Sequence, residues 1–276
     1  MCAGVRRDAT GSDAGDAATA LVAWGNAWLT GHVGLDEAVD AVEKVAGPQI
    51  LSGAPGGAGA AAIGEAGPGD VTLRRGLGDL RVNGMTGLRL ALPAPGDPLG
   101  LTGPPGFNRA AVDTGAAVIA VLADRAVGLV PGEDRRGSSY VGVRWQCHDA
   151  TPAPPDVPPL QDADRQLMLA MRDATEVLLT VDDVDGVPPE ITDALADLRD
   201  PDRGDHPLAP GYPQRAHRVA ALAGRLALVV DLARLLEGQG LTADQMRRRS
   251  EALRLLDRAV RRARVAACNS AFDPVP

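Results

Sequence analysis

The chain has 276 residues, a formal net charge of -8 and a sequence pI of about 5.0, and 45% of its residues are hydrophobic. This length and apolar content are enough to close one large core or two smaller ones, which excludes a disordered chain. The negative charge argues against attraction of the whole surface to nucleic acid or anionic membranes, so any such binding would be local.

Residue usage indicates the compartment. Lys44 is the only lysine among 28 basic residues, and Ala, Gly and Pro are abundant, which is typical of a GC-rich genome. The three cysteines, Cys2, Cys147 and Cys268, are far apart and form no CxxC pair, so neither a disulfide framework nor a zinc module is indicated. The longest purely apolar run, residues 116–122, is much shorter than the roughly 20 residues that cross a bilayer. With no apolar leader at the N-terminus, we expect a cytosolic protein without membrane contact.

The first part of the chain predicts helices. Residues 1–11 are polar and predict a disordered tail. Apolar residues spaced by three and four predict helices at residues 12–30, 35–46 and 70–84. Ser12 or Asp13 is the expected cap of the first, and Asp70 of the third. Trp24 and Trp28 lie one turn apart in the first helix, which fits packing on the core better than an aromatic clamp for a ligand.

Alternation of apolar and polar residues predicts a sheet of about four strands, mostly antiparallel. The expected strands are residues 87–92, 116–122, 126–130 and 140–147. The second is apolar throughout and is expected to be buried on both faces, in a hairpin with the third. A continuous helix over residues 108–123 is the alternative. Residues 131–139 are expected to form a polar loop.

Residues 93–108 follow the first strand and contain five prolines and four glycines. Such a backbone predicts an irregular loop at the surface. Arg144 and His148 share one face of the last strand, and that polar face could border the loop at Asp97. A solvated sheet face is the alternative to a binding site there. The candidate binding residues are Asp97, Asn108, Arg109, Arg144 and His148.

The second part of the chain predicts helices alone. Residues 149–159 hold five prolines and predict a stiff connector between an α+β domain of residues 12–150 and a helical domain of residues 160–270. Helices are expected at residues 160–181, 189–198, 214–237 and 242–267. Short loops between them predict an antiparallel bundle. The expected fold class is therefore α+β, with N-terminal helices, an antiparallel sheet and a C-terminal bundle.

The last helix is strongly basic. Residues 241–267 carry a net charge of +5, whereas residues 151–200 carry -9. Opposite charges on neighbouring helices of one bundle can satisfy each other, and the alternatives are an acidic protein partner or self-association. Nucleic acid is disfavoured because the helix offers no aromatic side chain to stack on bases. The candidate partner surface consists of Arg247, Arg248, Arg254, Arg258, Arg261 and Arg262.

Signatures of catalysis are missing or incomplete. Residues 57–62 match GxGxxA loosely, but only Ile50 and Leu51 could begin the strand that should precede them, and Pro55 lies in the turn. Residues 182–186 resemble a calcium loop, but its first and twelfth ligand positions hold a valine and a threonine. Cys147 and His148 are adjacent on a strand and so point to opposite faces. We predict no catalytic residue, metal site or cofactor. The first hypothesis is a non-catalytic interaction or scaffold protein. The alternatives are a small-molecule-binding domain or enzyme with its site at residues 93–108, and nucleic-acid contact through the last helix.

Overall fold

The computed structural model describes residues 10–53, 69–136, 140–181, 208–235 and 242–272. The chain divides into two compact units. Unit 1 comprises residues 1–157 with the short segments Ala209–Tyr212 and Ala271–Asp273, and unit 2 holds the remainder from Pro158 onward. Thr10 and Gly11, expected in a disordered tail, belong to the first helix, and residues 1–9 lie outside the described ranges.

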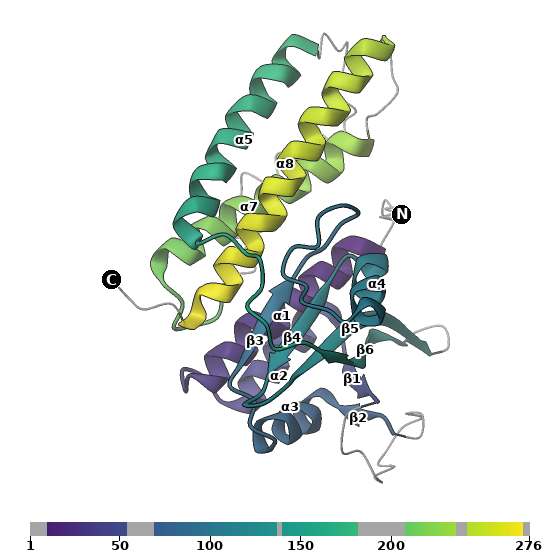
Figure 1. The fold of residues 1–276 in the computed structure, drawn as a ribbon, viewed down its shortest axis with the longest axis vertical. Coiled ribbons are helices and arrows are strands. Elements are labelled where there is room, and N and C mark those ends of the chain that lie inside the picture. The colour runs from purple at the N-terminus through teal and green to yellow at the C-terminus, as the bar shows by residue number, and fades with distance from the viewer. Residues whose placement is uncertain (1–9, 54–68, 137–139, 182–207, 236–241, 273–276) are drawn as a thin grey trace, which may run out of the picture. The chain divides into compact units, whose positions relative to one another are not determined.

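Unit 1 combines four described helices with one sheet (Figure 1). The helices are α1 (Thr10–Leu29), α2 (Leu35–Ala46), α3 (Leu73–Val82) and α4 (Pro105–Thr114). The strands are β1 (Gln49–Ser52), β2 (Val71–Thr72), β3 (Gly87–Ala91), β4 (Ala117–Val121), β5 (Ala126–Arg136) and β6 (Tyr140–Ala150). Their order in the sheet is β2-β1-β6-β5-β4-β3.

The expected α+β class is confirmed, but the expected number of strands is wrong. The sheet has six strands where about four were expected. It is mixed because β1 runs parallel to β6, while the other neighbouring strands pair antiparallel, as expected for most of the sheet. Strands β1 and β2 contain only four and two residues, which is too short for alternation to be recognised in the sequence. The predicted hairpin of β4 and β5 is confirmed, so the alternative helix over residues 108–123 is wrong.

Strands β5 and β6 form a long hairpin with an unbroken register from Ala126 opposite Ala150 to Arg136 opposite Tyr140. The prediction of a polar loop over residues 131–139 is therefore wrong for residues 131–136, and residues 137–139 lie outside the described part of the chain. The polar sequence misled because this end of the hairpin extends past β4, which pairs only with Ala126–Leu129.

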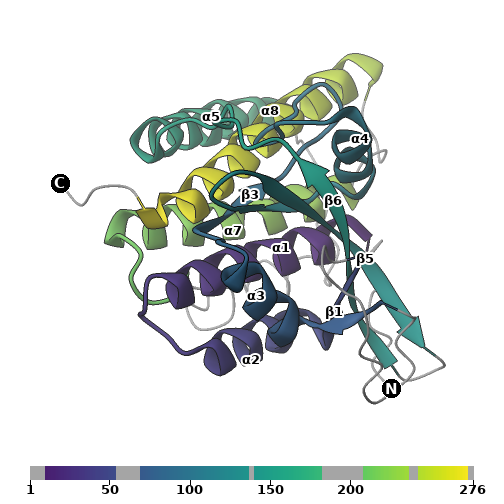
Figure 2. The same ribbon diagram turned by 60° about the horizontal axis from the view of Figure 1, so that its bottom comes forward.

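Helices cover the two faces of the sheet unequally. Figure 2 shows α1, α2 and α3 on one side of the strands and α4 on the other. On the α3 side, Leu51 lies so close to Gly76 that a Cβ at Gly76 would be 2.6 Å from its methyl carbon. Trp145 is fully buried on this face, and its indole N–H donates to the side-chain oxygen of Gln49 at 2.8 Å. A buried tryptophan thereby keeps its polar atom bonded.

Helix α1 is joined to the edge strand β3 by one side chain. The side-chain amide of Asn26 donates to the carbonyl of Leu88 at 2.9 Å, and the Leu88 N–H donates to its oxygen at 2.8 Å. Asn26 is fully buried, and the small Gly25 immediately before it lets the helix approach the Leu88 side chain. One asparagine thus satisfies two backbone groups at the edge of the sheet.

The proline-rich segment is more ordered and more buried than expected. Its last residues belong to α4, which begins at Pro105 because proline fits the first position of a helix. The sequence predicts Asn108 as a helix cap, but it lies inside α4, where its side-chain oxygen accepts from the Gly103 N–H at 3.0 Å. Asp97 and Leu99 are buried, so the expectation of a surface loop is wrong for part of the segment.

Helix α4 packs on the sheet through Phe107. The ring of Phe107 is buried and lies over Gly128 of β5, where a Cβ would come within 2.4 Å of it. Ala91, Ala111, Ile119 and Val130 belong to the same apolar cluster. Since each ring carbon occupies space that a side chain at Gly128 would need, glycine is required here by packing and not by backbone conformation.

Unit 2 contains the described helices α5 (Leu160–Val181), α7 (Gln214–Leu235) and α8 (Ala243–Asn269). Helix α8 packs against both others and runs opposite to α5, as Figure 1 shows. The sequence predicts Thr242 as the cap of this helix, and the prediction is confirmed because Thr242 forms a capping box with Gln245. The predicted helix at residues 189–198 lies outside the described residues.

The buried stripe of α8 differs from the expected one at its start. Near-heptad spacing predicts a stripe of Met246, Leu253, Leu256, Val260 and Ala267. All but Met246 are buried, whereas Met246 is exposed and Arg249 is buried. No helix in the described ranges is both long enough and apolar enough to cross a membrane.

Gly128 offers a test of the α4 packing. We expect Gly128→Ala to destabilise the protein by about 1–3 kcal/mol, because the added methyl must displace the Phe107 ring in a close-packed core. Urea unfolding measures this change. Gly132→Ala on the same strand is the control, since its nearest neighbour would be a backbone oxygen at 3.8 Å. Equal effects of the two substitutions would contradict this packing.

Candidate functional site

Arg144 of β6 lies at the centre of a polar cluster contributed by three strands, β1, β5 and β6, and by Asp70 before β2. Its Nη1 donates to the Asp70 carboxylate at 2.5 Å and to the Ser52 hydroxyl at 2.8 Å. Its Nη2 donates to Asp134 of β5 at 3.3 Å, and Asp134 also pairs with Arg136 at 2.8 Å. The cluster therefore contains two guanidinium groups and two carboxylates, which balance in charge.

Burial makes this cluster different from a surface ion pair. The side chains of Asp70 and Asp134 are each 6% exposed, and that of Arg144 is 29% exposed. The hydrogen bond that Arg144 donates to Asp70 raises the pKa of Arg144, with a smaller contribution from the one to Asp134. Arg144 is thus a bound cation between buried carboxylates, and its guanidinium is occupied by the protein's own groups.

The other predicted binding residues lie in different surroundings. His148 faces α4, where its ring centroid is 6.0 Å from that of Phe107 and its buried Nε2 forms no hydrogen bond with the described residues. The backbone N–H and C=O of Asp97 form two hydrogen bonds with the backbone of Ala94. Arg109 is exposed on α4. Arg144 therefore lies between the carboxylates of Asp70 and Asp134, whereas His148 lies against the ring of Phe107. The site predicted from Asp97, Asn108, Arg109, Arg144 and His148 stays a prediction.

The sequence alone does not reveal the acidic partners of Arg144. Its pattern predicts a loop around Asp134, and it predicts Asp70 as the cap of α3, whose N-cap is Thr72. A longer β5 would have given the signal, because an antiparallel register continued from Val127 opposite Asp149 brings Asp134 close to Arg144.

The two described thiols are not poised for chemistry at neutral pH. Burial raises the pKa of Cys147 to about 11 and that of Cys268 to about 12. Both are therefore protonated, and the thiolate is the nucleophilic form. Cys147 and His148 lie opposite Leu129 and Gly128 on β5, so their side chains are on different faces of the sheet.

Two further kinds of site are a cluster of metal ligands and an aromatic clamp formed by Trp24 and Trp28 of α1. Within the described ranges, no three side chains of His, Cys, Asp or Glu gather in a way that could hold a metal ion. Trp24 and Trp28 are half-buried, and the Arg81 guanidinium lies 4.9 Å from the ring centroid of Trp28. This cation–π contact covers one of the two indoles.

The arginines of α8 form the second candidate surface. Arg247, Arg248 and Arg254 are exposed and pair with acids of their own helix: Arg247 and Arg248 with Asp244, and Arg254 with Glu251. The bond to Arg254 lowers the pKa of Glu251, and it raises the pKa of Arg254. Arg261 is mostly buried and pairs with Asp257, Arg258 is exposed, and Arg262 is half-buried.

The comparisons with known proteins agree along the whole chain. Residues 18–162 match the N-terminal domain of the Rv1486c-like protein, and residues 161–265 match its C-terminal domain. The chain belongs to the Rv1486c-like protein family. The two family domains meet at the first residues of α5.

Members of the Rv1486c-like family in mycobacteria resemble the chain over most of its length. It is 30% identical to the uncharacterized protein Rv1486c of Mycobacterium tuberculosis (strain ATCC 25618 / H37Rv), covering 90% of this chain and 94% of that protein. It is 29% identical to the uncharacterized protein ML1804 of Mycobacterium leprae (strain TN), covering 91% and 95%. No solved structure matches the chain significantly.

Removing Arg144 tests whether the polar cluster stabilises the sheet. We expect Arg144→Gln to cost about 2–4 kcal/mol in urea unfolding, because two buried carboxylates lose their shared cation. The double variant Arg144→Gln plus Asp70→Asn should lose less unfolding free energy than the sum of the losses of the two single variants. Arg135→Gln is the control, because Arg135 pairs with Glu133 at the surface and is 67% exposed. Its cost should be about 0.5 kcal/mol or less, and additive effects at Arg144 and Asp70 would refute the coupling.

Alkylation of Cys147 tests its protonation. In a Cys2→Ser background we expect the iodoacetamide rate to be low at neutral pH and to rise about tenfold per pH unit until the pKa of about 11. N-acetylcysteine, measured in parallel, should level off about two units lower, near the ordinary thiol pKa. A plateau for Cys147 at that lower pH would show that burial does not hold the thiol protonated.

Proposed function

We propose that the protein is a non-catalytic interaction protein and that α8 binds an acidic protein partner. The observation that carries this proposal is the composition of the exposed face of α8, where arginines surround an exposed leucine. Helix α8 holds eight arginines and three acids, a net charge of +5. Such a face attracts an acidic surface at long range and orients it during the encounter.

The apolar side chain at the centre of this face is Leu255, which is exposed. On a helix, Leu255 lies one turn from both Glu251 and Arg258. Arginine is enriched at the energetic centres of protein interfaces, and the exposed Leu255 adds apolar surface that a partner can bury. Met246, also exposed, lies nearer the start of the same helix.

The ion pairs already present on this face do not block such a partner. Arg247, Arg248 and Arg254 pair with carboxylates three or four residues away on an exposed helix surface. Pairs of this kind contribute about 0.3–0.5 kcal/mol each, so a partner's carboxylates can replace or share them at low cost. The buried stripe of Leu253, Leu256 and Val260 keeps the helix in place while its outer face binds.

Affinity capture with the full chain tests the proposal. We expect at least one stoichiometric acidic protein to be recovered, and we expect its recovery to fall severalfold with Arg247→Gln plus Arg254→Gln, and with added salt. Arg165→Gln on α5 is the matched control: Arg165 is 63% exposed and pairs with an acid three residues earlier, as the 62% exposed Arg254 does. The control should leave recovery unchanged.

A substitution that should strengthen partner binding provides a second test of the proposal. Glu251→Gln removes the carboxylate that competes for Arg254, so the partner should bind more tightly by about twofold. Nuclease treatment of the lysate separates protein binding from the alternative of nucleic-acid contact. A strictly monomeric mass by light scattering, together with no partner whose recovery depends on these arginines, would refute the proposal.

A further inference from the structure

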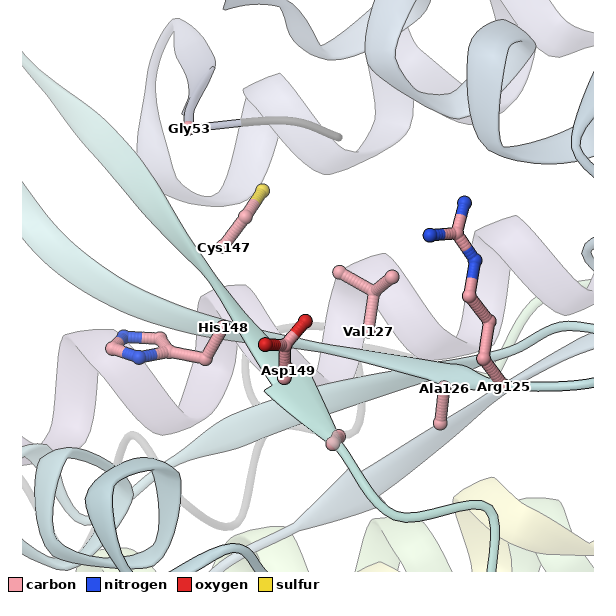
Figure 3. A pocket seen from close by; sticks show the side chains of 8 residues that line it. Gly53, Arg125, Ala126, Val127, Cys147, His148 and Asp149 are labelled. Atoms are coloured by element: carbon pink, nitrogen blue, oxygen red, sulfur yellow. The ribbon is translucent and has the colours of Figure 1, made fainter. Parts of the chain in front are cut away.

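A shallow hollow of about 240 Å³ lies at one end of the sheet in unit 1. The residues that line it come from the turn before β5, from the start of β5, from the end of β6 and from Gly53 after β1. Figure 3 shows the side chains of Arg125, Val127, Cys147 and Asp149 on the same side of these strands, while the ring of His148 points away. The hollow is thus separate from both surfaces described above.

The strand register explains why these four side chains meet. Val127 lies directly opposite Asp149, and Cys147 is two residues before Asp149, so the three share one face. Val127 is buried and Cys147 is half-buried, which makes a largely apolar floor. A protonated thiol adds to this floor as a small apolar group.

Two opposite charges stand at the rim of this floor. Arg125 and Asp149 are both exposed, and neither forms an ion pair with a residue in the described ranges. In Figure 3, Val127 lies between the Asp149 carboxylate and the Arg125 side chain. The cation and the anion are therefore presented to the same hollow on the two sides of an apolar contact surface, and both are free to bind a ligand.

The backbone of β6 adds one donor and one acceptor at this place. The Val143 N–H donates to Pro48, so the odd-numbered residues of β6 direct their backbone groups toward β1. Pairing with β1 ends at Ser52 opposite Gln146, and the Thr151 N–H just after β6 donates to Gly103. Between Gln146 and Thr151, the backbone N–H and C=O of Asp149 point away from β5 and form no hydrogen bond with the described residues.

We propose that this hollow binds a free α-amino acid, with its carboxylate at Arg125, its ammonium group at Asp149 and its side chain on Val127 and Cys147. The small volume excludes drug-sized ligands, which fill about 300–1,000 Å³. A zwitterion matches both rim charges at once, whereas the end of a peptide carries only one of the two charges. This site goes beyond the proposed partner surface on α8 and does not depend on it.

Binding of the twenty L-amino acids to the full chain tests the proposal, with heteronuclear NMR of Val127 and Asp149 as the readout. We expect at least one amino acid to bind below about 10 mM. Its methyl ester and its N-acetyl derivative should each bind about tenfold more weakly, because each lacks one charge-assisted contact. A dipeptide with free ends that binds more tightly than its constituent amino acids would assign the site to peptide ends and overturn the proposal.

Charge-removing variants locate the two contacts. Arg125→Gln should weaken the amino acid about tenfold and leave its methyl ester unchanged, and Asp149→Asn should weaken it similarly and leave the N-acetyl derivative unchanged. Arg109→Gln and Asp124→Asn are the controls, since both residues are exposed and neither lines the hollow. Thermal unfolding verifies that each variant is folded. No binding by any amino acid at about 10 mM, or binding that ignores both rim substitutions, would refute the proposal.

Discussion

The unbroken register of β5 and β6 is the constraint on which the rest of unit 1 depends. Because no bulge interrupts the pairing, the position of one pair fixes the face of every other side chain on the hairpin. Gly128 is thereby placed under Phe107, Asp134 comes close to Arg144, and Val127 lies opposite Asp149. If β5 slipped by one residue, the ring of Phe107 would lie over a side chain and Asp134 would point away from Arg144.

The parts of this fold that could be predicted from the sequence are those with local signals. The bounds of α2 and the cap of α8 follow from spacing and from a capping box, and β4 follows from a short run of β-branched and other apolar residues. Strands β1 and β2 could not be predicted because their stability comes from partners far away in the chain. Gln49, for instance, bonds to Trp145, 96 residues later. The polar half of β5 was missed because hairpin pairing, and not apolar alternation, makes it a strand.

The chemistry of single residues was harder to predict than the fold. Arg144 was recognised as a polar residue on a strand, but its partners were assigned to a loop and to a helix cap, so a neutralised cluster looked like a free cation. Arg125 and Asp149 drew no attention because isolated charges are common in a surface turn and at a strand end. Only the register shows that an apolar floor lies between them. The arginines of α8 were visible in the sequence because they occur together in one helix.

The side chain of Asn26 has a consequence for the solubility of the sheet. At an edge strand, a backbone N–H and C=O that point outward are a template on which a strand of another molecule can add. At Leu88 that template is already occupied by an amide with the same donor and acceptor geometry as a peptide group. The Asn26 side chain of α1 therefore takes the place of a neighbouring strand at Leu88. It protects this part of the edge from cross-β pairing between molecules.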